Sequence, residues 1–131
     1  MTLIILSGVL IVSLGASDLV TSGTKQGRTQ AYSTKAYFAA EAGAERVLWE
    51  IRKNNFVFLN ASNQECQTND YINFDNDNTP PNTAYCGGEQ INTLLNGATY
   101  SVVFKSAGAS ATTTAAIGGY HDANRSVEIT Y

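Results

Sequence analysis

Charged side chains are absent from the first 17 residues of the chain, Met1 to Ser17, which are predominantly apolar. No basic segment precedes this run and no cleavage site lies within it, which argues against a removable secretory signal. A helix of that length measures about 25 Å, and adding Leu19 and Val20 brings it close to the roughly 30 Å hydrocarbon core of a bilayer. We therefore expect a retained apolar helix in a membrane or an equally dry environment.

Histidine and basic residues are scarce. The chain has one histidine, His121, and eight Lys and Arg against eleven Asp and Glu, which gives a net charge of −3. The cations are spread along the chain, so nucleic acid is not an expected partner. His121 has no triad context, and Glu41 and Glu45, with Arg46 beside them, indicate a solvated helix face or ion pairs between subunits. We recognise no catalytic set, and expect neither enzymatic activity nor a cofactor.

Cysteine occurs only twice, as Cys66 and Cys86, without a CxxC motif that would indicate zinc. In an exported chain the pair predicts a disulfide closing a loop of about 20 residues, worth about 3 kcal/mol. Two free thiols are the alternative. Asn60 and Asn124 each begin a triplet that matches the glycosylation sequon, which is a weak signal.

Two polar or aromatic patterns have ordinary explanations beside the functional ones. The stretch Asp75–Thr79, with Asp70 and Asn73 nearby, resembles part of a calcium loop, but it lacks the EF-hand spacing, so a polar surface loop is favoured and no metal is expected. Aromatic residues in the helical region could stack on nucleic acid, but their helical spacing favours packing. They are Tyr32, Tyr37, Phe38 and Trp49.

A long helix is predicted over residues 1–53. Within its apolar part, residues 1–20, small side chains recur every seven residues at Gly8, Gly15 and, just beyond, Ser22. Such a strip lets helices approach closely in an apolar environment, although incidental glycines on a loosely packed anchor are the alternative. Residues 21–27 contain two glycines, each costing roughly 1 kcal/mol relative to alanine, so we expect the helix to fray, kink or unwind there.

The second half of the predicted helix carries one apolar stripe. Its members follow steps of four, four, three and four residues, with Leu48 flanking, and this spacing predicts packing against a sheet or another helix. Lys35, Arg46, Glu50 and Arg52 are expected to lie mostly away from the stripe. The stripe comprises Ala36, Ala40, Ala44, Val47 and Ile51.

Residues 54–131 predict a small globular head. We expect a long irregular loop over residues 60–88, tied by the cysteines, and an antiparallel sheet of three to four strands over residues 98–131. Gly108 and Gly118-Gly119 are expected to supply turns between those strands. The expected fold class is α+β, with the long helix packed on the small sheet.

Several segments resemble the type IV pilin and pseudopilin family. The opening Met1-Thr-Leu-Ile is similar to the start of processed pilins, and Ala36-Tyr-Phe-Ala-Ala-Glu-Ala-Gly43, continuing to Leu48, is similar to the Glu-Ala-Gly helix segment of one pilin subfamily. The ending Ile117–Tyr120 with Arg125–Glu128 is similar to that subfamily's closing hairpin. The region 54–97 has no counterpart.

The chain departs from the family at two places. Ile5 stands where most pilins carry a glutamate that neutralises the N-terminal amine of an adjacent subunit, and the usual proline in the middle of the apolar helix is absent. Thr2, Ser7 or Asp18 would have to take part in recruitment instead. Asp18 itself lies at the edge of the span, where an interfacial position near Lys25 is the alternative to a charge partner in an assembled bundle.

The resemblance implies a structural subunit of an extracellular pilus-like filament. Such a subunit carries a basic leader cut by a prepilin peptidase, waits in the inner membrane, and is extracted by pilus assembly machinery into a homo-oligomeric helical fibre. A minor or tip pseudopilin, of a pilus or a type II secretion system, and a membrane-anchored extracellular binding domain are the alternatives. The residues expected to form the assembly helix are Met1, Ile4, Ile5, Gly8, Val12, Gly15, Asp18 and Ser22.

Overall fold

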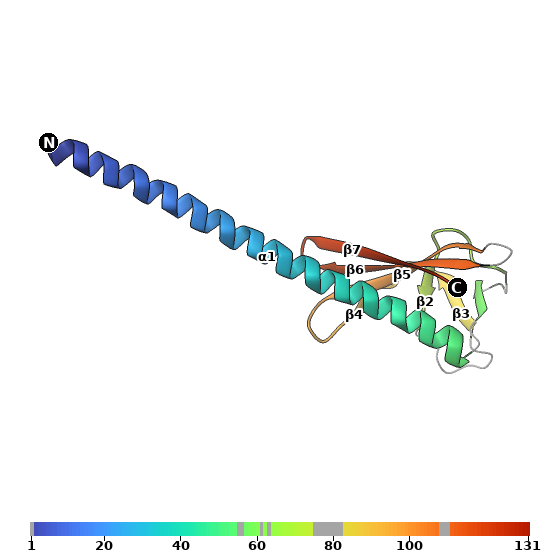
Figure 1. Ribbon diagram of the computed structural model, residues 1–131. Helices are drawn as coiled ribbons and strands as arrows, with labels where there is room; N and C mark the ends of the chain where they lie inside the picture. The colour runs from blue at the N-terminus through green and yellow to red at the C-terminus, as the bar shows by residue number, and fades with distance from the viewer. Residues whose placement is uncertain (1, 55–56, 61, 63, 75–82, 108–110) are drawn as a thin grey trace. The chain divides into compact units, whose positions relative to one another are not determined.

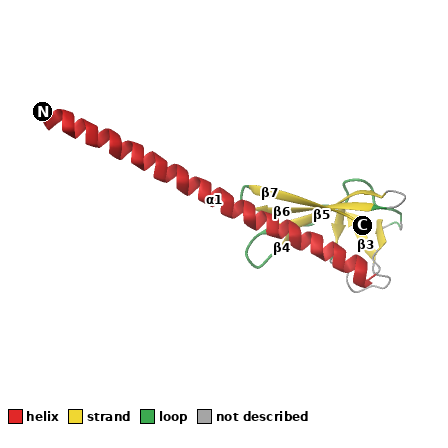
Figure 2. Cartoon of the chain, in the orientation of Figure 1, coloured by secondary structure: helices red, strands yellow, loops and turns green. Residues whose placement is uncertain are grey.

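The computed structural model describes residues 2–54, 57–60, 62, 64–74, 83–107 and 111–131. Within them one helix is followed by seven strands (Figures 1 and 2). The chain divides into two units, Met1–Ala31 and Tyr32–Tyr131, and helix α1 contributes to both. The elements are α1 (Thr2–Asn54), β1 (Val57–Asn60), β2 (Tyr71–Asn73), β3 (Thr83–Gly87), β4 (Asn92–Thr93), β5 (Thr99–Ala107), β6 (Thr112–Tyr120) and β7 (Ala123–Thr130).

Helix α1 is continuous through residues 21–27, where unwinding was expected. The hydroxyl groups of Thr21 and Thr24 donate to the carbonyl oxygens of Ser17 and Val20, each at 2.9 Å, so these polar side chains are accommodated within the helix. The helix is therefore formed here despite the glycines, and a locally low stability of this stretch stays a prediction.

The second half of α1 packs on the sheet through its small residues. Ala36, Ala40 and Val47 are completely buried and Ala44 nearly so, while Leu48 and Ile51 are partly buried. The alanines bring the helix backbone close to the strands because they add little side-chain volume between the two layers.

Glu50 corrects the predicted polar face. It was expected to lie away from the apolar stripe, but only 1% of its surface is exposed. Glu50 follows Val47 by three residues, and positions three apart share a helix face, so it is carried under the sheet with the stripe. Its carboxylate pairs with Arg46, one turn earlier, with Nε and Oε1 2.9 Å apart.

The sheet is larger than the three to four strands expected. Seven strands form one sheet in the order β1-β3-β2-β5-β6-β7, and β4 pairs with β5 off that path. The strands β5, β6 and β7 form the expected antiparallel meander. The segment expected as an irregular loop supplies β2 and β3, and the β1–β3 pair is parallel. β2 and β3 were missed because they have only three and five residues, too few to show a clear apolar alternation.

Gly118 and Gly119 lie inside β6, where a turn was expected. The turn that follows β6 is formed by His121 and Asp122, and His121 has a positive φ of 51°. Gly118 is needed in the strand for a different reason: a Cβ atom there would overlap the backbone of Ala36 and Ala40 in α1. Gly108, the other expected turn residue, lies outside the described residues.

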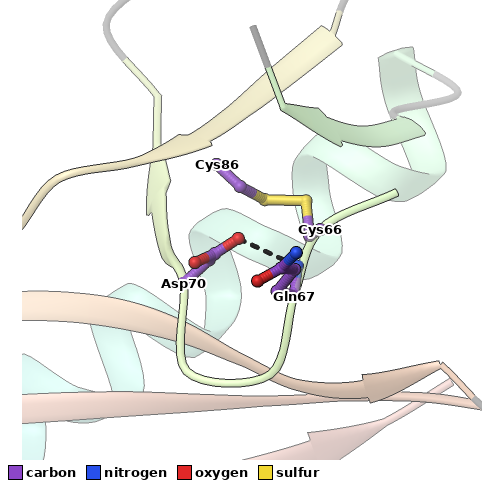
Figure 3. Close-up of a disulfide and its surroundings, with 4 residues drawn as sticks. All are labelled: Cys66, Gln67, Asp70 and Cys86. Carbon is purple, nitrogen blue, oxygen red and sulfur yellow. Dashed lines mark hydrogen bonds between the residues drawn. A yellow bond between two sulfur atoms is a disulfide. The ribbon is translucent and has the colours of Figure 1, made fainter. Parts of the chain in front are cut away.

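The expected disulfide joins Cys66 to Cys86, and both cysteines are buried (Figure 3). Their Cα atoms are 5.7 Å apart, and Cys86 lies in β3 opposite Ile72 of β2. Beside the bond, the backbone N–H of Gln67 donates to a carboxylate oxygen of Asp70 at 2.8 Å (Figure 3). The disulfide therefore belongs to the core of the head, in one hydrophobic cluster with buried residues of α1 and the sheet.

Candidate functional site

The first candidate site is the apolar surface of α1 in the unit Met1–Ala31. Every described side chain from Leu3 to Ala31 is exposed. Apolar side chains of this size normally lie inside a protein, and a continuous exposed set marks a surface that contacts lipid or another protein. The large members are Leu3, Ile4, Ile5, Leu6, Val9, Leu10, Ile11, Val12, Leu14, Leu19 and Val20, which are between 57% and 82% exposed.

Three hydroxyl groups within or next to this surface are bonded to the helix itself. Ser7 donates to the carbonyl oxygen of Ile4 at 2.9 Å, and Thr21 and Thr24 make the corresponding bonds further along. Burying a hydroxyl without a hydrogen bond costs several kcal/mol in an apolar medium, of order 2–7. Because these three donors are already bonded, they can enter a dry environment without that cost.

A strip of small residues crosses the same surface. A Cβ atom at Gly8 or Gly15 would meet nothing within 4 Å, and Ser22 is exposed. A larger side chain therefore fits at either glycine in the isolated chain. An effect of such a side chain on function would consequently report on a neighbouring molecule.

The described residues among those expected to form the assembly helix all lie on α1 and are exposed. Asp18 lies within the apolar surface, just before Leu19 and Val20, and Lys25 lies about two turns further along the helix. Met1 lies outside the described residues. The described members are Ile4, Ile5, Gly8, Val12, Gly15, Asp18 and Ser22.

In the head, an aromatic cluster attaches the β6–β7 turn to α1. The rings of Tyr32 and His121 are stacked with their centroids 4.7 Å apart, and Tyr32 meets Tyr120 edge-on at 5.4 Å. Lys35 donates to the Tyr120 hydroxyl at 3.1 Å, and Arg125 donates to Ser33 at 2.9 Å. His121 thus has a packing contact, in line with the structural role expected for it.

Three other aromatic residues of α1 differ from expectation. Tyr37, Phe38 and Trp49 were expected to pack, but they are 45%, 59% and 52% exposed. A side-chain hydrogen bond to Glu41, together with the charge of that carboxylate, raises the pKa of Tyr37 above its usual value. The side of α1 away from the sheet is thus partly apolar, with acidic groups among the rings.

The β4–β5 turn carries apolar side chains that the sequence analysis did not single out. Leu95 is fully exposed and Ile91, just before β4, is 58% exposed. The available signal was a pair of leucines, Leu94 and Leu95, directly before Asn96-Gly97, because that dipeptide typically occupies a turn.

Other predicted sites are only partly covered by the described residues. Asn124 is exposed in β7, whereas the side chain of Asn60 and the stretch Asp75–Thr79 lie outside the described part. Within the described residues no three His, Cys, Asp or Glu side chains are grouped so that they could hold a metal ion. Asp70, part of the suggested calcium loop, instead accepts a hydrogen bond from the Gln67 backbone.

Comparisons with known proteins found no matching family model, curated protein or solved structure. In the described part of the chain, one helix, α1, has the length and apolar composition needed to cross a bilayer. Length and composition are weak evidence by themselves, since signal sequences share both.

Proposed function

We propose that this chain is a structural subunit of an extracellular filament of the type IV pilus kind, which polymerises through the apolar segment of α1. The observation that carries the proposal is that every side chain from Leu3 to Val20 is exposed. Burial of each large member is worth roughly 1.5–3 kcal/mol. Lipid must therefore bury these side chains before assembly, and equivalent helices must bury them afterwards.

The helix is suited to exchange one dry environment for the other. The hydroxyl groups of Ser7 and Thr21 are bonded within the helix, so neither lipid nor protein must supply partners for these two. Its glycines leave room for close approach of a second helix. In this proposal the subunit waits in the inner membrane, a prepilin peptidase removes a leader, and the assembly machinery transfers the helix into the filament core.

The exposed head surface then covers the fibre. The disulfide closes the segment between Cys66 and Cys86. Disulfides of this kind are typical of exported proteins. Ile5 stands at the position where the resembled family usually has a glutamate that pairs with the N-terminal amine of an adjacent subunit. In this proposal, neighbouring subunits are instead aligned by helix packing at the strip of small residues Gly8, Gly15 and Ser22.

A bulky side chain at Gly15 tests the proposal. Gly15→Phe should lower filament yield strongly because it blocks the close approach of helices, while Ser13→Phe is a matched small-to-large control about 160° around the helix. Filaments would be sheared from the cell surface and counted by electron microscopy. Equal yields from the two variants would contradict close packing at the strip.

The same experiment separates the rival functions. Filaments composed mainly of this chain, with a methylated N-terminus by mass spectrometry, would support a major subunit over a minor or tip pseudopilin. The length and composition of α1 are also compatible with a membrane-anchored binding domain. That function predicts a detergent-solubilised monomer that never polymerises.

A further inference from the structure

Two cations of α1 follow the apolar surface and point to a partner of the subunit before assembly, an inference whose biological role rests on the proposed function. They are Lys25 and Arg28, and both are exposed. Residues 19–40 contain three Lys and Arg and no Asp or Glu, whereas residues 41–131 contain five Lys and Arg against ten Asp and Glu. An acidic chain that is basic in one segment is suited to contact an anionic surface with that segment.

Neither cation is neutralised by its own helix. Charge partners on a helix lie three or four residues apart, and no Asp or Glu lies within four residues of Lys25 or Arg28. Asp18 precedes Lys25 by seven residues, about 10 Å along the axis, and no ion pair joins these two described residues. The next cation, Lys35, donates a hydrogen bond of 3.1 Å within the head. Lys25 and Arg28 are therefore the cations available to a ligand beside the apolar surface.

Their distance from the apolar surface matches the polar layer of a bilayer. At 1.5 Å per residue, Lys25 lies about 8 Å and Arg28 about 12 Å beyond Val20, the last large apolar residue of that surface. The polar layer on each side of the hydrocarbon core is about 5–8 Å thick. Side chains on a helix lean toward its N-terminus, and long cationic side chains extend to reach headgroups. Both charges therefore reach the level of the lipid phosphates when Leu3–Val20 fills the hydrocarbon core.

The two cations also share one side of the helix. Positions three residues apart are separated by about 60° around the axis, so one ligand, or two neighbouring ligands, can contact both side chains. An arginine holds a phosphate through two parallel N–H donors, and a lysine adds a compact point charge.

We propose that Lys25 and Arg28 bind the phosphate groups of anionic phospholipids in the leaflet from which the head emerges. Lipid is the occupant indicated by two separate features, the exposed positive charge and its fixed distance from the segment that fills the bilayer. Near an anionic membrane surface, each such cation strengthens the attraction roughly fivefold. In the waiting subunit these contacts set the depth of the helix, and they are released when the helix is extracted.

Lipid retention by the full-length chain tests the site. The chain is solubilised in nonionic detergent with equal amounts of phosphatidylglycerol and phosphatidylcholine, and the bound lipids are counted by native mass spectrometry. The wild type should prefer phosphatidylglycerol, and Lys25→Gln/Arg28→Gln should reduce that preference at least tenfold. Arg52→Gln/Lys53→Gln removes the same charge from exposed positions at the other end of α1, so this matched control should keep the preference.

Further arms separate the other anions. Inorganic phosphate at matched ionic strength should displace little phosphatidylglycerol, and complete displacement would assign the site to free phosphate. A wild type without a lipid preference, or an equal loss in both double variants, would overturn the lipid site. Lys25→Gln/Arg28→Gln chains that keep the preference but form no filaments would overturn it in favour of an acidic surface on a neighbouring copy. Wild-type chains that show the preference but form no filaments would overturn the proposed function and leave the lipid site in place.

Discussion

Gly118 of β6 lies against the backbone of Ala36 in α1, so closely that a Cβ atom on Gly118 would overlap the Ala36 carbonyl oxygen. Ala40 crowds the same point through its backbone nitrogen, and Gly43, one turn later, faces the Tyr100 ring. Helix and sheet are thus held at a separation that only the absence of a side chain permits.

Gly118→Ala should destabilise the head by about 3 kcal/mol or more, at the upper end of overpacking costs, because backbone atoms cannot move aside as a flexible side chain can. Gly43→Ala should cost less, since its new Cβ would be 2.8 Å from Tyr100 Cδ2, on a ring that can tilt. Urea unfolding of the detergent-solubilised chain measures both values. Gly87→Ala, which meets no atom within 4 Å, is the control, and an equal loss at Gly87 would refute the explanation.

Reduction of the disulfide should lower the free energy of unfolding by about 3 kcal/mol, the value for a closed loop of this length. Cys66 and Cys86 are the chain's only cysteines, so a reductant acts on this bond alone. The Cys66→Ser/Cys86→Ser variant should show the same loss and no response to reductant. A wild-type Tm that is unchanged by reduction would contradict the structural role.

Arg46→Ala should cost roughly 2 kcal/mol, because it removes the cation beside a carboxylate that is 1% exposed. The value is set below that of a fully buried pair because Arg46 is 36% exposed and its charge is partly screened by solvent. Arg52→Ala, at an exposed position on the same helix, is the control and should have little effect. Comparable losses from the two variants in urea unfolding would show that the ion pair is not the cause.

Tyr131 should make the head sensitive to alkali. Burial raises its pKa above the ordinary value of 10, although the nearby Thr114 hydroxyl acts in the opposite direction. The folded state therefore keeps a proton that the unfolded chain releases, so stability is unaffected below about pH 10 and falls as the pH rises beyond it. Tyr131→Phe should flatten the fall in Tm between neutral and alkaline pH. An unchanged pH profile in that variant would assign the alkaline loss to other groups.

The sequence predicted best where one periodicity decided the structure. The steps between Ala36, Ala40, Ala44 and Val47 anticipated a buried helix face, and all four residues are buried. Along β7 and into Tyr131, which follows it, Val127, Ile129 and Tyr131 are partly buried. They alternate with the exposed residues Ser126, Glu128 and Thr130, in agreement with the alternation in the sequence. Each of these patterns is local, so it can be recognised without knowledge of the partner surface.

Features that depend on distant partners could not be predicted in this way. Strand β3 is held between β1 and β2 by pairing and by the disulfide, and its own five residues show no periodic signal. A glycine pair commonly marks a turn, and the close approach of Gly118 to α1 is visible only when both elements are placed. Exposure at Leu95 likewise follows from the turn conformation, which the composition of the segment does not specify.

The uncharged stretch of α1 has an electrical consequence. Moving one elementary charge across a membrane potential of 100 mV involves about 2.3 kcal/mol, but residues 3–17 contain no ionisable side chain. A segment of this kind can leave the bilayer with no work done by or against the voltage, apart from that on groups outside it. If the chain assembles as proposed, collapse of the cell's membrane potential should neither help nor hinder the transfer of this segment itself.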